Sequence, residues 1–243
     1  EGMRELVALR DRAVTAWADS EYNASILRAA GYPDVHVLPI IVDMSRLEMA
    51  PDPVFERQWR SSQYTWAFIG RVSPNKRHEN IIRAYACYKK HIHPHSRLLL
   101  IGENRNCWRY TQAMVDRVRS VGVGDVHFTG MVDDAELVAA YRMADVFVCM
   151  SEHEGFCVPL LEAMHFDLPV LAYRAGAVPE TMGGAGVLLN TRDPVVIAEL
   201  VEQLRVDTGF RRSVIDGQRR RLAVFRAMDL TGCVRDLLEG MIR

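Results

Sequence analysis

The sequence predicts an α/β protein whose main part is a doubly wound parallel sheet. From residue 64 onward, short β-rich apolar runs alternate with longer segments in which apolar residues recur at helical spacing. The run at 146–150 is continuously apolar, which is typical of a strand buried on both faces. Strands that alternate with helices indicate a parallel sheet covered by helices on both sides.

Six strands are expected in this part of the chain. They are Thr65–Ile69, Arg97–Ile101, Val126–Thr129, Val146–Met150, Val170–Tyr173 and Gly186–Leu189. Helices are expected between most of them. Asp133 with Glu136 has the spacing of a capping box, and Asp193 followed by Pro194 marks another helix start.

Residues 1–44 do not form a complete unit by themselves. Strands are expected at 13–18 and 35–38, with a helix between them that Ser20 caps and Gly31 ends. Two strands and one helix cannot cover both faces of a sheet, so we expect this part to be the end of a larger domain. Residues 45–63 contain two prolines and are expected to be a linker.

Composition and charge argue against several classes of protein. The chain has 243 residues, is 49% hydrophobic and carries a net charge of −1, as ordinary globular proteins do. Near-neutral charge argues against a nucleic-acid binder, and no apolar run approaches the roughly 18 residues of a membrane span. The five cysteines form no CxxC pair, which predicts free thiols in a reducing compartment rather than disulfides or a zinc site.

A strand, a turn and a helix follow one another at residues 145–164. The turn contains Gly155, and Pro159 stands where a first helical residue is expected. Open α/β sheets bind ligands at such turns, and the helix start offers free N–H groups. Glu154 and Glu162 can each accept hydrogen bonds from a pair of hydroxyls. Taken alone, Glu162 is more simply explained by the helix dipole, and Glu154 by solvation.

These residues resemble the signature of a known family. The two glutamates, with seven residues between them that include Phe156 and Pro159, are similar to the signature of retaining glycosyltransferases of family 4, which have the GT-B fold. The family usually has glycine where this chain has Cys157. The resemblance extends over about residues 13–190.

The resemblance also implies how the domains are divided. Residues 64–225 would be the Rossmann-like domain that binds a nucleotide sugar, and residues 1–44 would be the remnant of a second Rossmann-like domain, on the acceptor side. The helix at 226–243 would cross back toward that first domain.

A second charged group follows the strand Thr65–Ile69. Gly70, Arg71 and Lys76 match the family's glycine and paired cations, which hold the donor diphosphate. Arginine can bind phosphate oxygens bidentately, and lysine acts as a point charge. Taken alone, a basic loop of this kind is usually just solvated. Val132 matches a family position that contacts the nucleobase through its backbone.

The implied reaction transfers a sugar from a nucleotide diphosphate sugar to an acceptor hydroxyl, with retention of the anomeric configuration. The expected donor-binding residues are Gly70, Arg71, Lys76, Val132, Glu154, Gly155, Phe156, Cys157, Val158 and Glu162. Arg71, Lys76 and the N–H groups of residues 156–158 would stabilise the leaving diphosphate. Glu154 would orient the transferred sugar, and Glu162 would hold the ribose. The family uses no protein nucleophile, and we expect no metal and no cofactor.

Other functions stay open at this point. They are a nucleotide-sugar-binding fragment without activity of its own, a GT-B nucleotide-sugar epimerase, and a phosphorylase-like enzyme with a lysine-bound pyridoxal phosphate. The isolated chain is expected to be weak or inactive, because the family's acceptor site belongs to the first domain.

The expected partners are the nucleotide-sugar donor and a saccharide or lipid-linked acceptor, in polysaccharide or glycolipid assembly. The nucleobase, the sugar and the acceptor stay open. The basic stretch at 211–226 is either a solvated helix face or a contact with an acidic membrane. We therefore expect a cytoplasmic protein, either free or at the inner face of the membrane.

Overall fold

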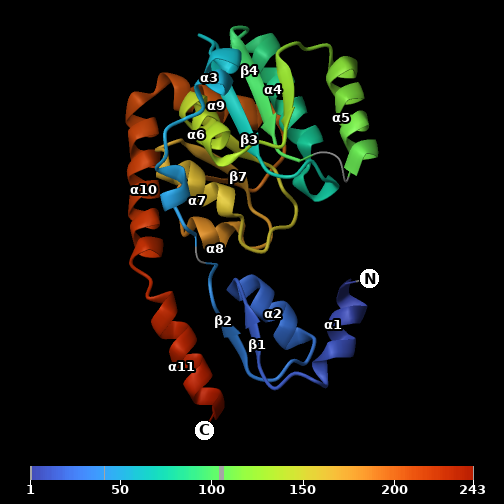
Figure 1. Cartoon of the computed structure of the whole chain (residues 1–243). Coiled ribbons are helices and arrows are strands. Elements are labelled where there is room, and N and C mark those ends of the chain that lie inside the picture. Colours follow the sequence, from blue (N-terminus) through green and yellow to red (C-terminus); the bar gives the residue numbers. More distant parts are fainter. Residues whose placement is uncertain (1, 41, 104–106, 243) are drawn as a thin grey trace.

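The computed structural model describes residues 2–40, 42–103 and 107–242, and these residues form two parallel sheets (Figure 1). The smaller sheet has two strands, whereas the larger has six strands in the order β5-β4-β3-β6-β7-β8. Every strand pair in the larger sheet is parallel. The predicted α/β class with a parallel sheet is therefore confirmed. Residues 1, 41, 104–106 and 243 of the predicted domains lie outside the described residues.

The strands follow the apolar runs of the sequence closely. They are β1 (Ala16–Ala18), β2 (Val35–Val37), β3 (Tyr64–Ile69), β4 (Ser96–Ile101), β5 (Val126–Gly130), β6 (Val146–Cys149), β7 (Val170–Tyr173) and β8 (Val187–Leu189). In the larger sheet, predicted and observed ends differ by at most one residue. In the smaller sheet, the first strand is three residues shorter than predicted, because β1 pairs with the three residues of β2.

The helices lie between these strands and after them. They are α1 (Gly2–Arg10), α2 (Glu21–Ala29), α3 (Pro53–Trp59), α4 (His78–His91), α5 (Trp108–Val121), α6 (Asp134–Met143), α7 (Val158–His165), α8 (Val178–Met182), α9 (Pro194–Val206), α10 (Thr208–Arg226) and α11 (Leu230–Ile242). Short 3-10 turns, η1 (Ser45–Leu47) and η2 (Pro74–Lys76), precede α3 and α4.

Local capping explains where several helices begin. The Asp133 carboxylate accepts from the Glu136 N–H, and the Glu136 carboxylate accepts from the Asp133 N–H, each at 2.9 Å. The predicted capping box at the start of α6 is therefore confirmed. Asp193 caps α9 ahead of Pro194, and Ser20 caps α2, both as predicted.

The strand order reverses between β3 and β6. From β3 the chain proceeds through β4 to β5 at one edge, and then returns through β6 and β7 to β8 at the other. Because parallel crossovers are right-handed, α4 and α5 cover one face, while α6, α7 and α8 cover the opposite face. Doubly wound sheets bind ligands at the carboxyl ends of the strands beside such a reversal. The loops after β3 and β6 therefore meet at the expected ligand-binding position.

The segment at 45–63, expected to be a linker, contains secondary structure that packs against the larger domain. It contains η1 and the helix α3, which packs against α6. Leu47 and Phe55 are buried, and the Asp52 N–H donates to the carbonyl of Ala135 at 3.0 Å. These apolar side chains gain stability by covering the helices of the larger sheet. The domain boundaries themselves stay a prediction.

The start of α2 contacts α8 and the turn after β6. The carboxylate of Glu180 accepts from the N–H groups of Glu21 at 2.8 Å and of Tyr22 at 3.2 Å, at the start of α2. Gly155 lies so close to α2 that a Cβ on it would be 2.9 Å from both Asp19 and Asn23. Figure 1 shows α11 running from the end of α10 toward the two-stranded sheet.

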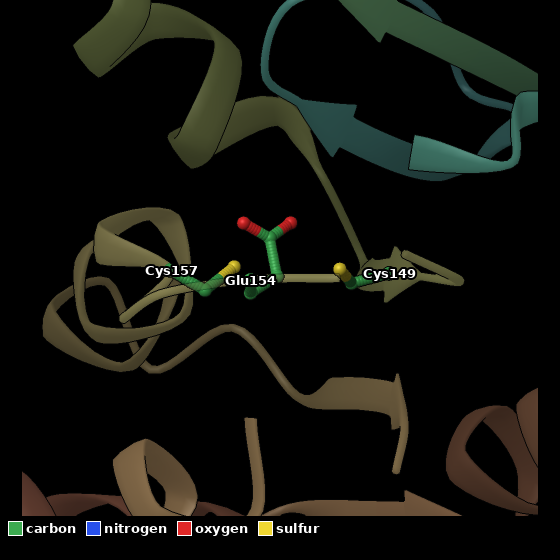
Figure 2. A group of neighbouring side chains, drawn as sticks. All are labelled: Cys149, Glu154 and Cys157. Atoms are coloured by element: carbon green, nitrogen blue, oxygen red, sulfur yellow. The ribbon is translucent and has the colours of Figure 1, made fainter. Parts of the chain in front are cut away.

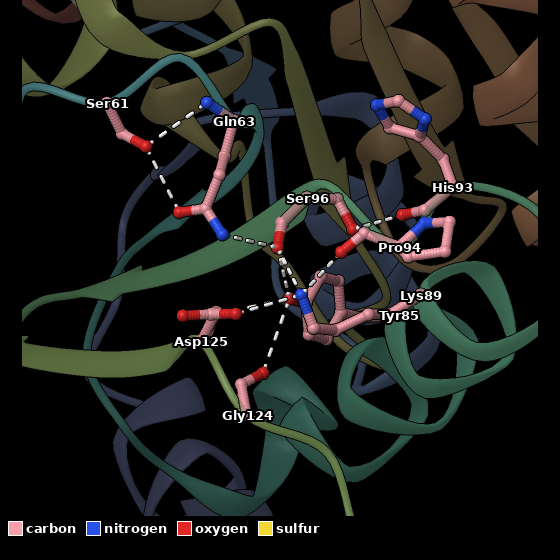
Figure 3. Close-up of polar contacts among 9 residues, drawn as sticks. All are labelled: Ser61, Gln63, Tyr85, Lys89, His93, Pro94, Ser96, Gly124 and Asp125. Carbon is pink, nitrogen blue, oxygen red and sulfur yellow. Dashed lines mark hydrogen bonds and ion pairs between the residues drawn. The ribbon is translucent and has the colours of Figure 1, made fainter.

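A polar network stabilises the opposite, amino-terminal edge of the larger sheet (Figure 3). The Lys89 ammonium donates to the carbonyls of Pro94 and Ser96 at 2.8 and 2.7 Å, and it pairs with Asp125 at 2.9 Å. The Tyr85 hydroxyl donates to the same Ser96 carbonyl at 2.9 Å. These bonds satisfy carbonyls at the amino ends of β4 and β5, so this edge has a structural role.

Candidate functional site

Two loops form the candidate site, one after β3 and one after β6. The loop after β3 contains Lys76, and the loop after β6 contains Glu154. Their backbones are joined directly, because the Glu152 N–H donates to the Asn75 carbonyl at 2.8 Å. The Asn75 amide also donates to the His153 carbonyl at 3.3 Å. Two segments that are far apart in the sequence are thus held as one unit.

An ion pair between Lys76 and Glu154 lies at the centre of this unit. The Lys76 ammonium donates to both carboxylate oxygens of Glu154, at 2.6 and 2.8 Å. The side chains are 20% and 8% exposed, respectively. Both residues were predicted as site residues, and the structure brings them into contact. A carboxylate this deeply buried requires a positive partner, since an isolated buried charge is strongly unfavourable.

The turn between Glu154 and α7 has an unusual backbone. Cys157 adopts the left-handed conformation, with φ of 71°. A residue with a side chain pays roughly 1–2 kcal/mol for this conformation, whereas glycine does not. This position is the one at which the resembled family usually has glycine. Cys157 makes no side-chain cap on α7, and Val158 begins that helix.

Two other residues hold the same turn in place. The side chain of Phe156 is buried and its ring lies 5.7 Å from that of Phe225 on α10. Gly176 approaches the backbone of Glu154 so closely that a Cβ on Gly176 would be 2.4 Å from the Glu154 carbonyl oxygen. The Ala177 N–H donates to that carbonyl at 2.9 Å. The position of Glu154 is therefore set by packing from two sides.

Glu162 is buried one turn into α7 and has its own partners. The Tyr141 hydroxyl donates to one carboxylate oxygen at 2.8 Å, and the Arg46 guanidinium pairs with the other. Arg46 also pairs with Asp134 at 2.5 Å. Burial raises the pKa of Tyr141 well above its usual range, and the Glu162 carboxylate raises it further, so the hydroxyl keeps its proton and donates.

The strand ends beside these carboxylates are glycines. Gly70, Gly102 and Gly130 end the adjacent strands β3, β4 and β5, and all three have positive φ angles. A Cβ on Gly102 would lie 2.2 Å from the carbonyl oxygen of Gly70. The carboxyl ends of these three strands therefore carry no side chain at the glycine positions, which lets a ligand approach the backbone closely.

The remaining predicted residues lie around this edge. The Arg71 side chain is 67% exposed, and its Nε lies 3.9 Å from a Glu103 carboxylate oxygen. Val132 is half-buried after β5, which is separated from β3 by β4 in the sheet. The structure thus brings Lys76 and Glu154 into contact, whereas Arg71 is directed to solvent.

Sequence reasoning missed three side chains at this site. Arg46 lies in the expected linker, where no local pattern marks a buried ion pair. Tyr141 is buried on α6, and its hydrogen bond to Glu162 depends on how α6 and α7 pack. Cys149 was expected to be a buried strand residue, and its thiol lies beside Glu154 and Cys157 (Figure 2).

A hollow of about 780 Å³ lies beside the same turn. His153 lines it from the loop after β6, and Trp17, Asp19 and Asn23 line it from the amino-terminal unit.

Within the described helices, none combines the length and the apolar character that a membrane crossing requires.

Comparisons with known proteins show the family of this chain. The family model described as glycosyl transferases group 1 matches residues 53–221. A GDP-mannose-dependent alpha-mannosyltransferase of Mycobacterium tuberculosis is 32% identical over 222 residues, which make up 87% of this chain and 54% of that protein. A D-inositol 3-phosphate glycosyltransferase of Salinispora arenicola is 31% identical over 169 residues, or 67% of this chain and 38% of that protein. The chain thus spans about half the length of these relatives, or less.

Solved structures share the fold. HepE from Anabaena, crystallised with UDP and glucose, superposes with a TM-score of 0.81 at 21% identity, covering 98% of this chain and 66% of that one. The C-terminal domain of LpcC from Francisella tularensis superposes with a TM-score of 0.62 at 25% identity, covering 75% of this chain and 97% of that domain.

Proposed function

The chain belongs to the family of glycosyl transferases group 1, and on this premise we propose that it provides the donor-binding part of a retaining glycosyltransferase of family 4. The fold is that of the GT-B glycosyltransferases. The observation that carries the proposal is the buried Lys76–Glu154 pair, which lies where the strand order reverses. A nucleotide diphosphate sugar presents phosphates and hydroxyls side by side, and this pair offers one group for each.

The Lys76 ammonium can bind a diphosphate without leaving Glu154. An ammonium has three N–H donors, and two of them point to the Glu154 oxygens. The third is available to a phosphate oxygen. Arg71, on the same loop, is exposed and can bind a phosphate with two parallel hydrogen bonds. The uncapped N–H groups at the start of α7 add donors and the positive end of the helix dipole.

The two carboxylates can hold hydroxyls for a similar reason. A carboxylate has about four lone-pair positions, and Lys76 occupies one on each oxygen of Glu154. The remaining lone pairs can accept from hydroxyls of the transferred sugar. Glu162 has one protein donor on each oxygen, from Tyr141 and Arg46, and its other lone pairs can accept from the ribose hydroxyls.

The reaction we propose needs no protein nucleophile. The acceptor oxygen forms a bond to the anomeric carbon on the face from which the diphosphate leaves, and its proton passes to the departing phosphate oxygen. Negative charge develops on the diphosphate as the bond to the sugar breaks. In this mechanism Lys76, Arg71 and the N–H groups of α7 stabilise that charge. Glu154 orients the sugar, and no metal is required.

The donor and the acceptor are also matters of proposal. Several relatives carry the name mannosyltransferase, and one is named as dependent on GDP-mannose. GDP-mannose is therefore the first donor that we propose, with UDP-glucose as the alternative. The acceptor would be a saccharide or lipid-linked saccharide, used in polysaccharide assembly. It would approach from the hollow lined by His153 and the amino-terminal unit. A lipid-linked acceptor would require the protein to contact a membrane peripherally.

Because the chain spans about half the length of its relatives, we propose that it binds the donor and transfers the sugar weakly or not at all. Titration calorimetry with GDP, UDP, ADP and their sugar conjugates tests donor binding. Micromolar binding of one nucleotide, weakened at least tenfold in Arg71→Ala and in Glu162→Ala, supports the proposal. Arg119→Ala is the matched control, because Arg119 is 72% exposed on α5 and pairs with a neighbouring aspartate.

Three outcomes would oppose parts of the proposal. If a folded sample binds no nucleotide or nucleotide sugar, this part of the chain does not hold the donor site. If the chain interconverts two nucleotide sugars without any acceptor, as chromatography would detect, it is an epimerase instead. Efficient transfer by the 243-residue chain would contradict the statement that it is weak or inactive by itself.

A further inference from the structure

Two thiols flank the Glu154 carboxylate (Figure 2). Cys149 ends β6, Glu154 lies in the turn, and Cys157 precedes the first residue of α7. Their ligand atoms, two sulfurs and a carboxylate oxygen, all lie within 4.8 Å of one another and are buried. The five described cysteines of the chain are free thiols. The three residues offer two soft sulfur ligands and one hard oxygen ligand.

The backbone holds the three side chains in this arrangement. Cys149 is in a central strand and is 1% exposed, and its thiol lies 3.4 Å from the Ser151 hydroxyl. Glu154 is fixed by Lys76 and by the close approach of Gly176. The left-handed backbone at Cys157 turns its side chain back toward β6, as Figure 2 shows. The arrangement therefore follows from the main-chain path rather than from a chance rotamer.

We propose that Cys149, Glu154 and Cys157 bind a thiophilic divalent cation, represented by Zn²⁺, and that this cation and the nucleotide sugar exclude each other. Thiolates select zinc over magnesium and calcium, which prefer oxygen ligands. Tetrahedral zinc with bonds of about 2.3 Å to sulfur and about 2.1 Å to oxygen needs ligand atoms about 3.5–3.8 Å apart. The observed limit of 4.8 Å is met by shifts of about 1 Å.

The mutual exclusion follows from the shared carboxylate. Glu154 binds Lys76 in the structure, and the Lys76 side chain is 20% exposed, so it can move into solvent when a cation takes the carboxylate. The same carboxylate is the proposed ligand of the transferred sugar. This second half of the inference rests on the proposed function, whereas the cation site itself does not. The cation is an inhibitor here and not a cofactor, so it leaves the metal-free mechanism unchanged.

Cobalt provides a direct test of the cation site. The full chain, kept reduced with a phosphine, is titrated with Co²⁺, and the absorbance of a thiolate-to-cobalt charge-transfer band is followed. Zn²⁺ is then added to displace the cobalt, which yields its affinity. We expect the band in the natural sequence, and at least a tenfold loss of affinity in Cys149→Ser and in Cys157→Gly.

Control variants separate this site from the other thiols. Cys233→Ser changes an exposed thiol on α11 and should leave the band and the affinity unchanged. Cys157→Gly suits the positive φ angle, so loss of cobalt binding there cannot be assigned to misfolding if its melting temperature is no lower than that of the natural sequence. The cation site is wrong if no charge-transfer band appears, or if Cys157→Gly binds cobalt as tightly as the natural sequence does.

Nucleotide titration in the presence of Zn²⁺ tests the exclusion. We expect at least a tenfold weaker apparent affinity for the best nucleotide sugar, and no such loss in Cys149→Ser, which controls for zinc bound to the nucleotide itself. Equal binding with and without zinc refutes the exclusion but leaves the donor site standing. If the metal-free chain binds no nucleotide, the proposed function fails, while the cobalt band still decides the cation site.

Discussion

The Lys76–Glu154 pair allows a prediction that separates stability from function. Replacing Lys76 with methionine keeps an unbranched apolar side chain but removes the ammonium, which leaves a carboxylate that is 8% exposed without its partner. At 2.6 Å and an effective dielectric constant of about 20, the attraction that is lost is about 6 kcal/mol before solvation is counted. Measured losses for breaking buried pairs are about 3–5 kcal/mol.

We expect the lower end of that range, because Lys76 is partly exposed and water can reach the site. Lys76→Met should lower the free energy of unfolding by about 3 kcal/mol, which corresponds to a melting temperature about 6–12 °C lower for a chain of this size. The double variant Lys76→Met with Glu154→Gln removes both charges together. It should recover to within about 1 kcal/mol of the natural sequence, since replacing both partners costs much less than removing one.

Urea unfolding followed by circular dichroism measures these stabilities for the two single variants and the double variant. Nucleotide binding, measured on the same samples, should be lost in the double variant even though its stability is restored. The reasoning is refuted if Lys76→Met is as stable as the natural sequence, or if adding Glu154→Gln lowers stability further.

Three further predictions concern other parts of the structure. Arg46→Gln should weaken binding of the best nucleotide about tenfold in calorimetry, because Glu162 loses its guanidinium partner, whereas Arg57→Gln on the exposed side of α3 should not. Gly102→Ala should lower the free energy of unfolding by at least about 2 kcal/mol, because its Cβ would lie 2.2 Å from the Gly70 carbonyl oxygen. Gly124→Ala is the control, because the space around Gly124 is open, and equal melting temperatures of the two variants would contradict the close approach at Gly102. Burial lowers the pKa of His78 to about 4, and both ring nitrogens are without a partner among the described residues. In the unfolded chain the histidine pKa is about 6.5, so between pH 4 and pH 6.5 the unfolded chain binds more protons than the folded one. The contribution of the neutral His78 to the free energy of unfolding is therefore full above pH 6.5 and is lost as the pH falls toward 4. Between pH 7 and pH 5, the free energy of unfolding measured in urea should fall by about 2 kcal/mol more in the natural sequence than in His78→Leu. Identical pH profiles for the natural sequence and the variant would contradict this prediction.

The patterns that predicted the fold are local ones. A strand buried on both faces must be apolar along its whole length, and so β3, β4 and β6 could be placed to within a residue from sequence. Asp133 and Glu136 could be assigned as a capping box because both bonds form within one turn of helix. The turn after β6, with its glutamates and its helix start, could be recognised for the same reason.

The contacts within the candidate site depend on strand order instead. Lys76 and Glu154 are 78 positions apart, and Arg46 and Glu162 are 116 apart. Neither pair has any local signal, because a charged loop residue looks the same in sequence whether it is solvated or paired. The thiols of Cys149 and Cys157 meet because a left-handed residue turns the chain back toward β6.

The sequence by itself therefore determined the class of fold, the ends of its main elements and the two loops that carry the candidate site. The tertiary structure decided which charges pair, that the expected linker packs as a helix, and that two cysteines lie beside Glu154. The physical reason is the range of the interactions. Hydrophobic period and helix capping act over a few residues, whereas an ion pair forms only after the sheet has placed β3 beside β6.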